Sequence, residues 1–252
     1  MSVLIDSHVH IYPHYDINSL LFSFEERVVH AKAGTGVMLL TERYGTDIFH
    51  EICNGDNISN SFNILQADET AVVLNRSSTP ETGINIVIVS GRQISCAERV
   101  EVLALATRAV FNDGYGIYDS INSVINAGGV PVLAWGVGKW MFKRESIIES
   151  VLERFTPEQI LIGDTSLRPV FWRRPKLMRL AMKKGYKVIA GSDPLSLKGD
   201  EQIVGQYANL LSGVDIDISK AVTPQIVEIV RSRQMATVGR RAGLLEFIRR
   251  MK

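Results

Sequence analysis

Cysteine is scarce in this chain, and that scarcity removes one class of protein. Cys53 and Cys96 are its two cysteines, in 252 residues. A small secreted scaffold that depends on disulfides carries more cysteines at closer spacing. We therefore expect two reduced and mostly buried thiols in a cytoplasmic protein.

Long apolar runs and an excess of one charge sign are also absent. No stretch approaches the length of about 20 apolar residues that a membrane-spanning helix needs. The first residues lack the basic region and long apolar core of a signal peptide, because Asp6 and His8 interrupt them. The formal net charge is +1, so we expect no general attraction to nucleic acid or to an anionic membrane.

Internal repeats and low-complexity linkers are missing as well. Hydrophobic residues make up 46% of the chain and charged residues 22%, which is ordinary for a globular protein. We therefore predict a single domain over residues 1–252.

Apolar runs of strand length alternate with helical periodicity along most of the chain. Strands are predicted at 3–5, 37–40, 86–89, 130–135, 160–163 and 187–190. Helices are predicted at 18–33, 46–53, 118–127, 143–155, 174–184, 200–212, 224–234 and 240–250. A capping box at Ser95 and Glu98 predicts one more helix, to about Phe111.

The segment 62–94 differs, because no helix fits between its apolar runs. Strands at 62–67, 71–75 and 84–90, with turns at 68–69 and 77–83, predict a hairpin elaboration over 62–90. From residue 130 onward, strands alternate with helices, which indicates parallel strands with helices packed outside. The predicted fold is α/β: a TIM-like (β/α) barrel of seven or eight strands with some distortion.

Asp6-Ser7-His8-Val9-His10 ends the first predicted strand. Residues two apart on a strand share a face, so Asp6, His8 and His10 should point the same way. Paired imidazoles suit zinc, iron, nickel or copper, and a carboxylate shifts the preference toward manganese. We predict that His8 and His10 bind a divalent metal, with Asp6 orienting a histidine from behind. A purely structural role for the pair is the alternative.

Further ligands should come from the C-terminal ends of other strands. The polar residues at those ends are Glu42, Gln93, Asp164 and Asp193. Asp193 is the best candidate, because Gly191-Ser192-Asp193 directly follows an apolar strand. The alternatives are a turn or cap for Asp164 and Asp193, and an ion pair for Glu42. The role of His14 is open, whereas His30 and His50 should be surface or packing residues on helices.

Basic residues follow three of the predicted strands. Arg92, Lys139 and Arg168 should lie at the mouth of the barrel and bind a small anionic or phosphorylated ligand. The alternative is a solvated loop in which these side chains pair with nearby acidic residues.

Four segments together resemble the PHP (polymerase and histidinol phosphatase) family of metal-dependent phosphoesterases: Asp6 to His10, Gly91 to Ile94, Val132 to Trp135, and Gly191 to Asp193. The first and last segments are similar to the amidohydrolase barrels too. The resemblance implies that His8, His10 and Asp193 are metal ligands.

Three positions depart from the PHP pattern. Gln93 stands where the family carries glutamate, and Trp135 and Leu195 stand where it carries histidine. Tryptophan and leucine cannot bind a metal, and glutamine binds weakly through a neutral oxygen. We therefore expect a reduced site that holds one zinc, manganese or iron ion, or none, with Gln93 beside it.

Three functions fit these residues. The first is a metal-dependent hydrolase, most simply of a phosphoester, with Asp164 or Asp193 as general base. The second is a non-catalytic PHP-like barrel that binds a ligand or a partner. The third is an amidohydrolase-type reaction on a C–N bond.

Overall fold

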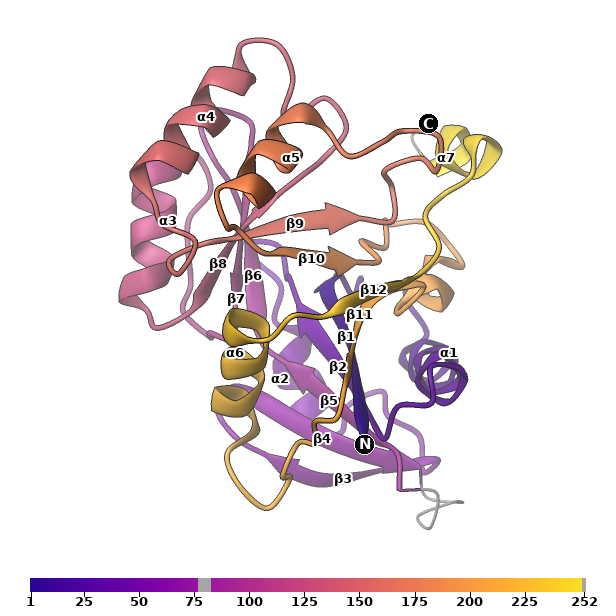
Figure 1. Ribbon diagram of the computed structural model, residues 1–252. Helices are drawn as coiled ribbons and strands as arrows, with labels where there is room; N and C mark the ends of the chain where they lie inside the picture. The colour runs from indigo at the N-terminus through magenta and orange to yellow at the C-terminus, as the bar shows by residue number, and fades with distance from the viewer. Residues whose placement is uncertain (77–82, 251–252) are drawn as a thin grey trace.

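The computed structural model describes residues 1–76 and 83–250, which form an α/β fold with two sheets (Figure 1). The strands are β1 (Ser2–Val9), β2 (Thr35–Leu40), β3 (Phe62–Ala67), β4 (Ala71–Arg76), β5 (Asn85–Val89), β6 (Gly91–Ser95), β7 (Glu101–Leu105), β8 (Val130–Ala134), β9 (Leu161–Thr165), β10 (Val188–Gly191), β11 (Tyr207–Ser212) and β12 (Ala236–Gly239). The helices are α1 (Ile17–His30), α2 (Ile48–Cys53), α3 (Ile117–Asn126), α4 (Arg144–Arg154), α5 (Lys176–Lys183), the 3-10 helix η2 (Asp200–Ile203), α6 (Val222–Ser232) and α7 (Leu244–Arg250).

The larger sheet has seven strands in the order β12-β11-β1-β2-β5-β4-β3, and the smaller has five in the order β10-β9-β8-β7-β6. Strands β1, β2 and β5 are parallel, as are β8, β9 and β10. The hairpin elaboration predicted over 62–90 is confirmed as β3, β4 and β5, which pair antiparallel in sequence. Of the turn predicted at 77–83, residues 77–82 lie outside the described residues.

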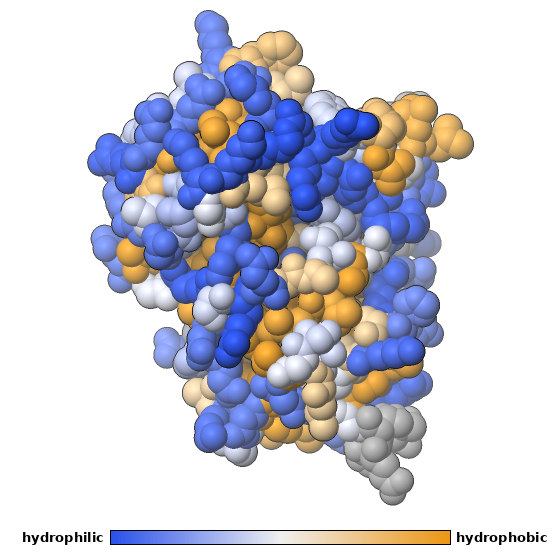
Figure 2. Space-filling model, viewed as in Figure 1, coloured by the Kyte–Doolittle hydropathy of each residue, from blue (hydrophilic) through white to orange (hydrophobic). Residues whose placement is uncertain are grey.

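Three buried apolar clusters hold the layers together. Helices α1 and α2 pack on one face of the larger sheet. The facing sides of the two sheets share a second core, to which α6 contributes. Helices α3, α4 and α5 cover the far side of the smaller sheet (Figure 1). Helix α7 differs, because Leu244, Leu245 and Ile248 are exposed, Leu245 by 83%. Figure 2 shows an orange patch at the upper right, where Figure 1 places α7.

The two sheets approach each other along two seams. At the first, the backbone N–H of Asp193, just after β10, donates to the carbonyl of His8 on β1 at 2.9 Å. At the second, the N–H of Glu42, just after β2, donates to the carbonyl of Gly91 on β6 at 3.0 Å. The described strands still form two separate sheets rather than a closed ring. The α/β class is therefore confirmed, and the closed TIM-like barrel is not.

Each seam has a glycine where the two backbones meet. A Cβ atom on Gly191 would lie 2.3 Å from the Cβ of His8, and one on Gly91 would lie 2.3 Å from the carbonyl oxygen of Leu40. Both distances are far below van der Waals contact, so only glycine lets the sheets come this close.

The helix predicted from Ser95 to Phe111 is wrong. This segment begins at the end of β6 and continues into β7, its antiparallel partner. Val102 and Leu103 are buried in different cores, so the apolar run is a strand with two buried faces. Glu98 does cap a helix, but a later one, because its carboxylate accepts from the N–H of Ile117 at 3.1 Å, at the start of α3.

The helix predicted at 200–212 is also wrong for most of its length. Only η2 is helical there, and β11 follows as the antiparallel partner of β1. Gly205 and Gly213, with φ of 79° and 75°, bracket this apolar run and limit it to the length of a strand. The prediction at 240–250 missed β12 ahead of α7, whereas the other predicted helices differ from the observed ones only at their ends.

Two smaller expectations can be compared with the described residues. Cys53 and Cys96 are both free, Cys96 being buried and Cys53 half-buried. No helix within 1–76 or 83–250 has the length and apolar character needed to cross a bilayer.

The seam at Gly191 yields a stability prediction. Gly191→Ala should lower the free energy of unfolding by about 3 kcal/mol, because the new methyl group would overlap the His8 backbone. Urea unfolding followed by circular dichroism measures the change. Gly34→Ala is the matched control, since its Cβ would meet Met1 at an ordinary 3.4 Å. Equal stability of the two variants would show that the seam is not a tight contact.

Candidate metal centre

Three side chains converge beside the first seam: His8 on β1, His10 just after β1, and Asp193 just after β10. The Nε2 atoms of the two histidines lie 3.1 Å apart. Asp193 Oδ1 is 3.5 Å from His8 Nε2 and 3.8 Å from His10 Nε2. The structure therefore brings together the three residues that the sequence ranked highest as ligands.

These distances fit a shared cation. Ligands at 2.0–2.1 Å around a tetrahedral zinc ion lie about 3.3 Å from one another. Burial lowers the pKa of His10 to about 3, and the neighbouring His8 lowers it further. The His10 ring is therefore neutral near neutral pH, the form in which an imidazole binds a metal. Two buried imidazoles and a half-buried carboxylate suit zinc, iron or manganese.

Asp193 is held in a defined orientation. Its φ is 51°, in the left-handed region, which aspartate tolerates better than most residues. Thr165 Oγ1 donates to Asp193 Oδ2 at 3.0 Å, so the other oxygen, Oδ1, faces the histidines. Burial alone would raise the pKa of Asp193, but electrostatic interaction with the neighbouring histidines and the Thr165 hydrogen bond lower it overall. The group is therefore an ionised ligand and a weak base.

Asp6 does not join the cluster, although strand alternation predicts that it should. Its carboxylate accepts from the backbone N–H groups of His8 at 3.2 Å, Ser192 at 2.9 Å and Gly205 at 2.7 Å. Burial raises the pKa of Asp6 to about 6, against the lowering effect of these donors. Asp6 therefore fixes the backbone of His8 against that of Ser192, which positions the strand rather than an imidazole ring.

Gln93 is the fourth polar group at the cluster. Its Oε1 lies 3.3 Å from His8 Nε2, so the amide reaches the position where the PHP pattern has glutamate. Trp135 is buried and packs edge to face against Trp172, with ring centroids 5.9 Å apart. Neither Trp135 nor Leu195 supplies a ligand.

Glu42 does not reach the histidines. One of its carboxylate oxygens accepts from the N–H groups of Ile48 and Phe49, at the start of α2. The other lies 3.5 Å from Arg92, which also contacts Asp47 and the carbonyl of Thr46. Burial raises the pKa of Glu42 against the opposing charge of Arg92. The structure therefore shows the alternative expected for Glu42, an ion pair. The same ion pair engages the guanidinium of Arg92, which was expected to bind a ligand.

Asp164 is likewise engaged elsewhere. Its two carboxylate oxygens accept from Arg168 at 2.7 and 2.5 Å, and the hydroxyl of Tyr207 donates to one of them at 2.8 Å. Burial alone would lower the pKa of Arg168, but the hydrogen bond and charge of Asp164 raise it. In this arrangement Asp164 has no free oxygen to act as a base, and Arg168 has its guanidinium turned toward Asp164 and the carbonyl of Trp172.

The remaining predicted cation, Lys139, forms an ion pair with Glu101, and its charge also lowers the pKa of Asp193. His14 is exposed and stacks on Tyr12, with ring centroids 5.9 Å apart. His30 and His50 are exposed on α1 and α2, as expected.

Two residues near the cluster were missed by the sequence reasoning. The buried hydroxyl of Tyr12 has no hydrogen-bond partner among the described residues. Exposed Arg43 lies with its guanidinium 5.7 Å from the Tyr12 ring centroid, and its charge lowers the pKa of His10. Arg43 forms no ion pair within 1–76 and 83–250. The available signals were the position of Arg43 directly after Glu42 and of Tyr12 two residues after His10.

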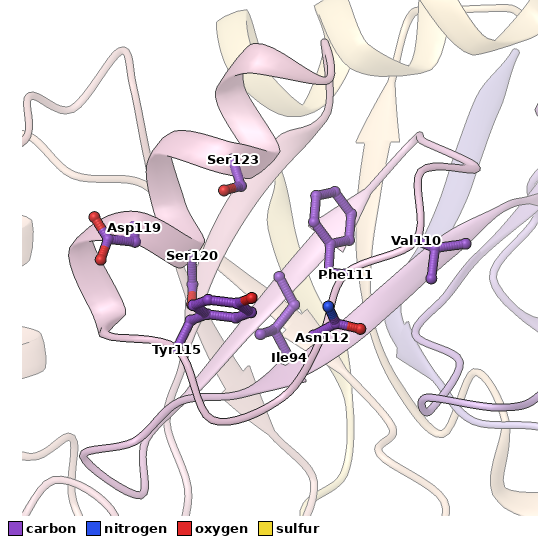
Figure 3. Close-up of a pocket in the computed structure, with 8 residues that line it drawn as sticks. All are labelled: Ile94, Val110, Phe111, Asn112, Tyr115, Asp119, Ser120 and Ser123. Atoms are coloured by element: carbon purple, nitrogen blue, oxygen red, sulfur yellow. The ribbon is translucent and has the colours of Figure 1, made fainter.

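Two hollows lie along strand β6. Gln93 lines a cavity of about 350 Å³ with Arg92, Tyr44 and Phe111. Ile94, its neighbour on the opposite face of the strand, lines the pocket of about 470 Å³ shown in Figure 3, together with Tyr115 and residues of α3. Val110 and Phe111 line both hollows, and Gln93, which contacts His8, lines only the first.

The sequence matches no family model and no curated protein. Solved structures do share its fold. PsfC from Pseudomonas syringae PB-5123 aligns with a TM-score of 0.60 at 13% identity, over 94% of this chain and 91% of that one. A two-domain protein from Bacteroides vulgatus, described as containing a predicted PHP-like metal-dependent phosphoesterase, aligns with a TM-score of 0.50 at 14% identity, over 99% and 70%.

A third solved structure is the lesion-specific endonuclease EndoQ of Pyrococcus furiosus, with a TM-score of 0.52 at 10% identity over 95% of this chain and 59% of that one. These likenesses confirm the PHP-like fold that the sequence motifs predicted. At such identities they show the fold alone.

The contact between Gln93 and His8 yields a prediction. Gln93→Glu places a second carboxylate at the cluster and should tighten binding of Mn²⁺ at least about tenfold, the scale of one added charge interaction. Without metal the same change should lower the melting temperature, because two buried carboxylates then repel.

Calorimetric titration and thermal unfolding measure the two effects. Gln66→Glu on the remote strand β3 is the matched control. Unchanged Mn²⁺ affinity in Gln93→Glu would remove Gln93 from the metal centre.

Proposed function

We propose that this chain is a metal-dependent phosphoesterase with a reduced site, in which His8, His10 and Asp193 hold one ion. The observation that carries the proposal is the convergence of these three donors within 4.8 Å, with both histidines buried and Asp193 half-buried. The PHP-like phosphoesterase among the proteins of similar fold supports the reaction class.

A bound divalent ion supplies a Lewis acid that polarises a phosphoryl oxygen and lowers the pKa of a water molecule toward neutrality. The protein's own residues have the task of binding and orienting the substrate. Asp193 serves as a ligand rather than a base, because its lowered pKa makes it a poor proton acceptor near neutral pH.

Substrate recognition falls to groups that the fold leaves available. Exposed Arg43 offers a guanidinium for a phosphate, since the predicted cations Arg92, Lys139 and Arg168 are engaged in ion pairs. The cavity beside Gln93, with Tyr44 and Phe111 in its wall, has room for an aromatic leaving group.

The test is hydrolysis of a panel of phosphomonoesters and phosphodiesters, aromatic and aliphatic, with Mn²⁺, Zn²⁺ or Fe²⁺ supplied to metal-free protein. We expect turnover that depends on metal and disappears in His10→Ala. No turnover with any substrate and metal, by protein shown to bind metal, would contradict the proposal and favour a ligand-binding role.

Arg43 gives a second, narrower prediction. Arg43→Ala should lower kcat/KM for a phosphate ester roughly tenfold or more, the scale of one charge-assisted hydrogen bond, with the loss reduced at high salt. Steady-state kinetics at two ionic strengths measure it. Arg233→Ala, at an exposed position after α6, is the control. Equal effects of the two variants would remove Arg43 from substrate binding.

A further inference from the structure

A buried arginine contacts the backbone of the turn that carries Asp193. Arg250, on α7, has a side chain only 1% exposed, and its partner Asp200, on η2, is 8% exposed. Both ionic groups are therefore withdrawn from water, and this desolvation is costly unless well-placed hydrogen bonds compensate for it.

The guanidinium of Arg250 makes two kinds of contact. Its Nε and Nη2 donate to Asp200 Oδ2 at 3.1 and 2.8 Å. Its Nη2 also donates to the backbone carbonyl of Asp193 at 3.2 Å, and its Nη1 to the hydroxyl of Ser166 at 3.4 Å. One planar group thus joins η2, the loop after β9 and the backbone of the metal-ligand residue.

Asp200 contacts the same turn from the other direction. Its Oδ2 accepts from the backbone N–H of Leu195 at 2.9 Å. The pair therefore holds the carbonyl of Asp193 and the N–H of Leu195, on either side of Pro194. These contacts stabilise the left-handed backbone of Asp193, which aspartate tolerates but does not favour.

The burial pattern of α7 is consistent with a helix that docks through Arg250 rather than through its apolar side chains. Leu244, Leu245 and Ile248 are exposed, and an orange patch lies over α7 in Figure 2, whereas Arg250 is buried. A helix that docked only to cover the core would bury its leucines and expose its arginine. Here the buried end of the helix is the one that reaches the Asp193 turn.

We propose that Arg250, with Asp200, is a positioning residue that holds Asp193 in its metal-binding orientation, so that metal affinity depends on α7. This inference rests on the metal centre of the proposed function. Groups that support metal ligands from behind typically change affinity by about 10–100-fold when mutated.

The experiment is a titration of metal-free protein with Co²⁺, followed by visible absorption. Arg250→Lys keeps the charge but loses the fork that joins Asp200 to the Asp193 carbonyl. We expect it to weaken Co²⁺ binding at least about tenfold and to shift the absorption band of the bound ion, with the fold intact by circular dichroism. Arg249→Lys, the same change at the exposed neighbour, should bind like the unaltered protein.

The outcomes separate this inference from the function it rests on. Co²⁺ affinity and spectrum unchanged in Arg250→Lys, while His8→Ala abolishes binding, would overturn the role of Arg250 and leave the metal centre standing. Absence of Co²⁺ binding by the unaltered protein would contradict the metal centre itself. If Arg250→Lys does not fold, Asp200→Asn replaces it, with the same expected loss and the same overturning result.

Discussion

The contact between β1 and β10 is the constraint on which this structure depends. Gly191 lets the two backbones approach, and the N–H of Asp193 then donates to the carbonyl of His8 at 2.9 Å. Asp6 strengthens the same contact by accepting from the N–H groups of both His8 and Ser192. Because of this one seam, a carboxylate from one sheet lies within 4 Å of two imidazoles from the other.

The histidine pair and its carboxylate partner were predictable from sequence because their signals are local. His8 and His10 alternate at the end of a strand, and Asp193 directly follows an apolar run. Most strands and helices were predictable for the same reason. The segment from Ser95 to Phe111 was not, since Val102 and Leu103 are buried on opposite faces by different layers, which local spacing does not reveal.

The roles of Glu42, Asp164 and the arginines depend on partners remote in sequence or on the path of a loop. Glu42 ends a strand as a metal ligand would, yet the start of α2 and Arg92 occupy both of its oxygens. Tyr207, from the other sheet, completes the enclosure of Asp164. A carboxylate at a strand end is therefore only a candidate ligand, because other hydrogen-bond donors can occupy its oxygens. Those donors are brought to it by the tertiary structure.

The central claim is that His8, His10 and Asp193 hold one metal ion, and elemental analysis tests it most directly. The protein is purified without added metal, beside a variant carrying both His8→Ala and His10→Ala. The account predicts close to one zinc, manganese or iron ion for each unaltered chain and a background level in the variant. Background levels in both proteins, or equal metal in both, would contradict it.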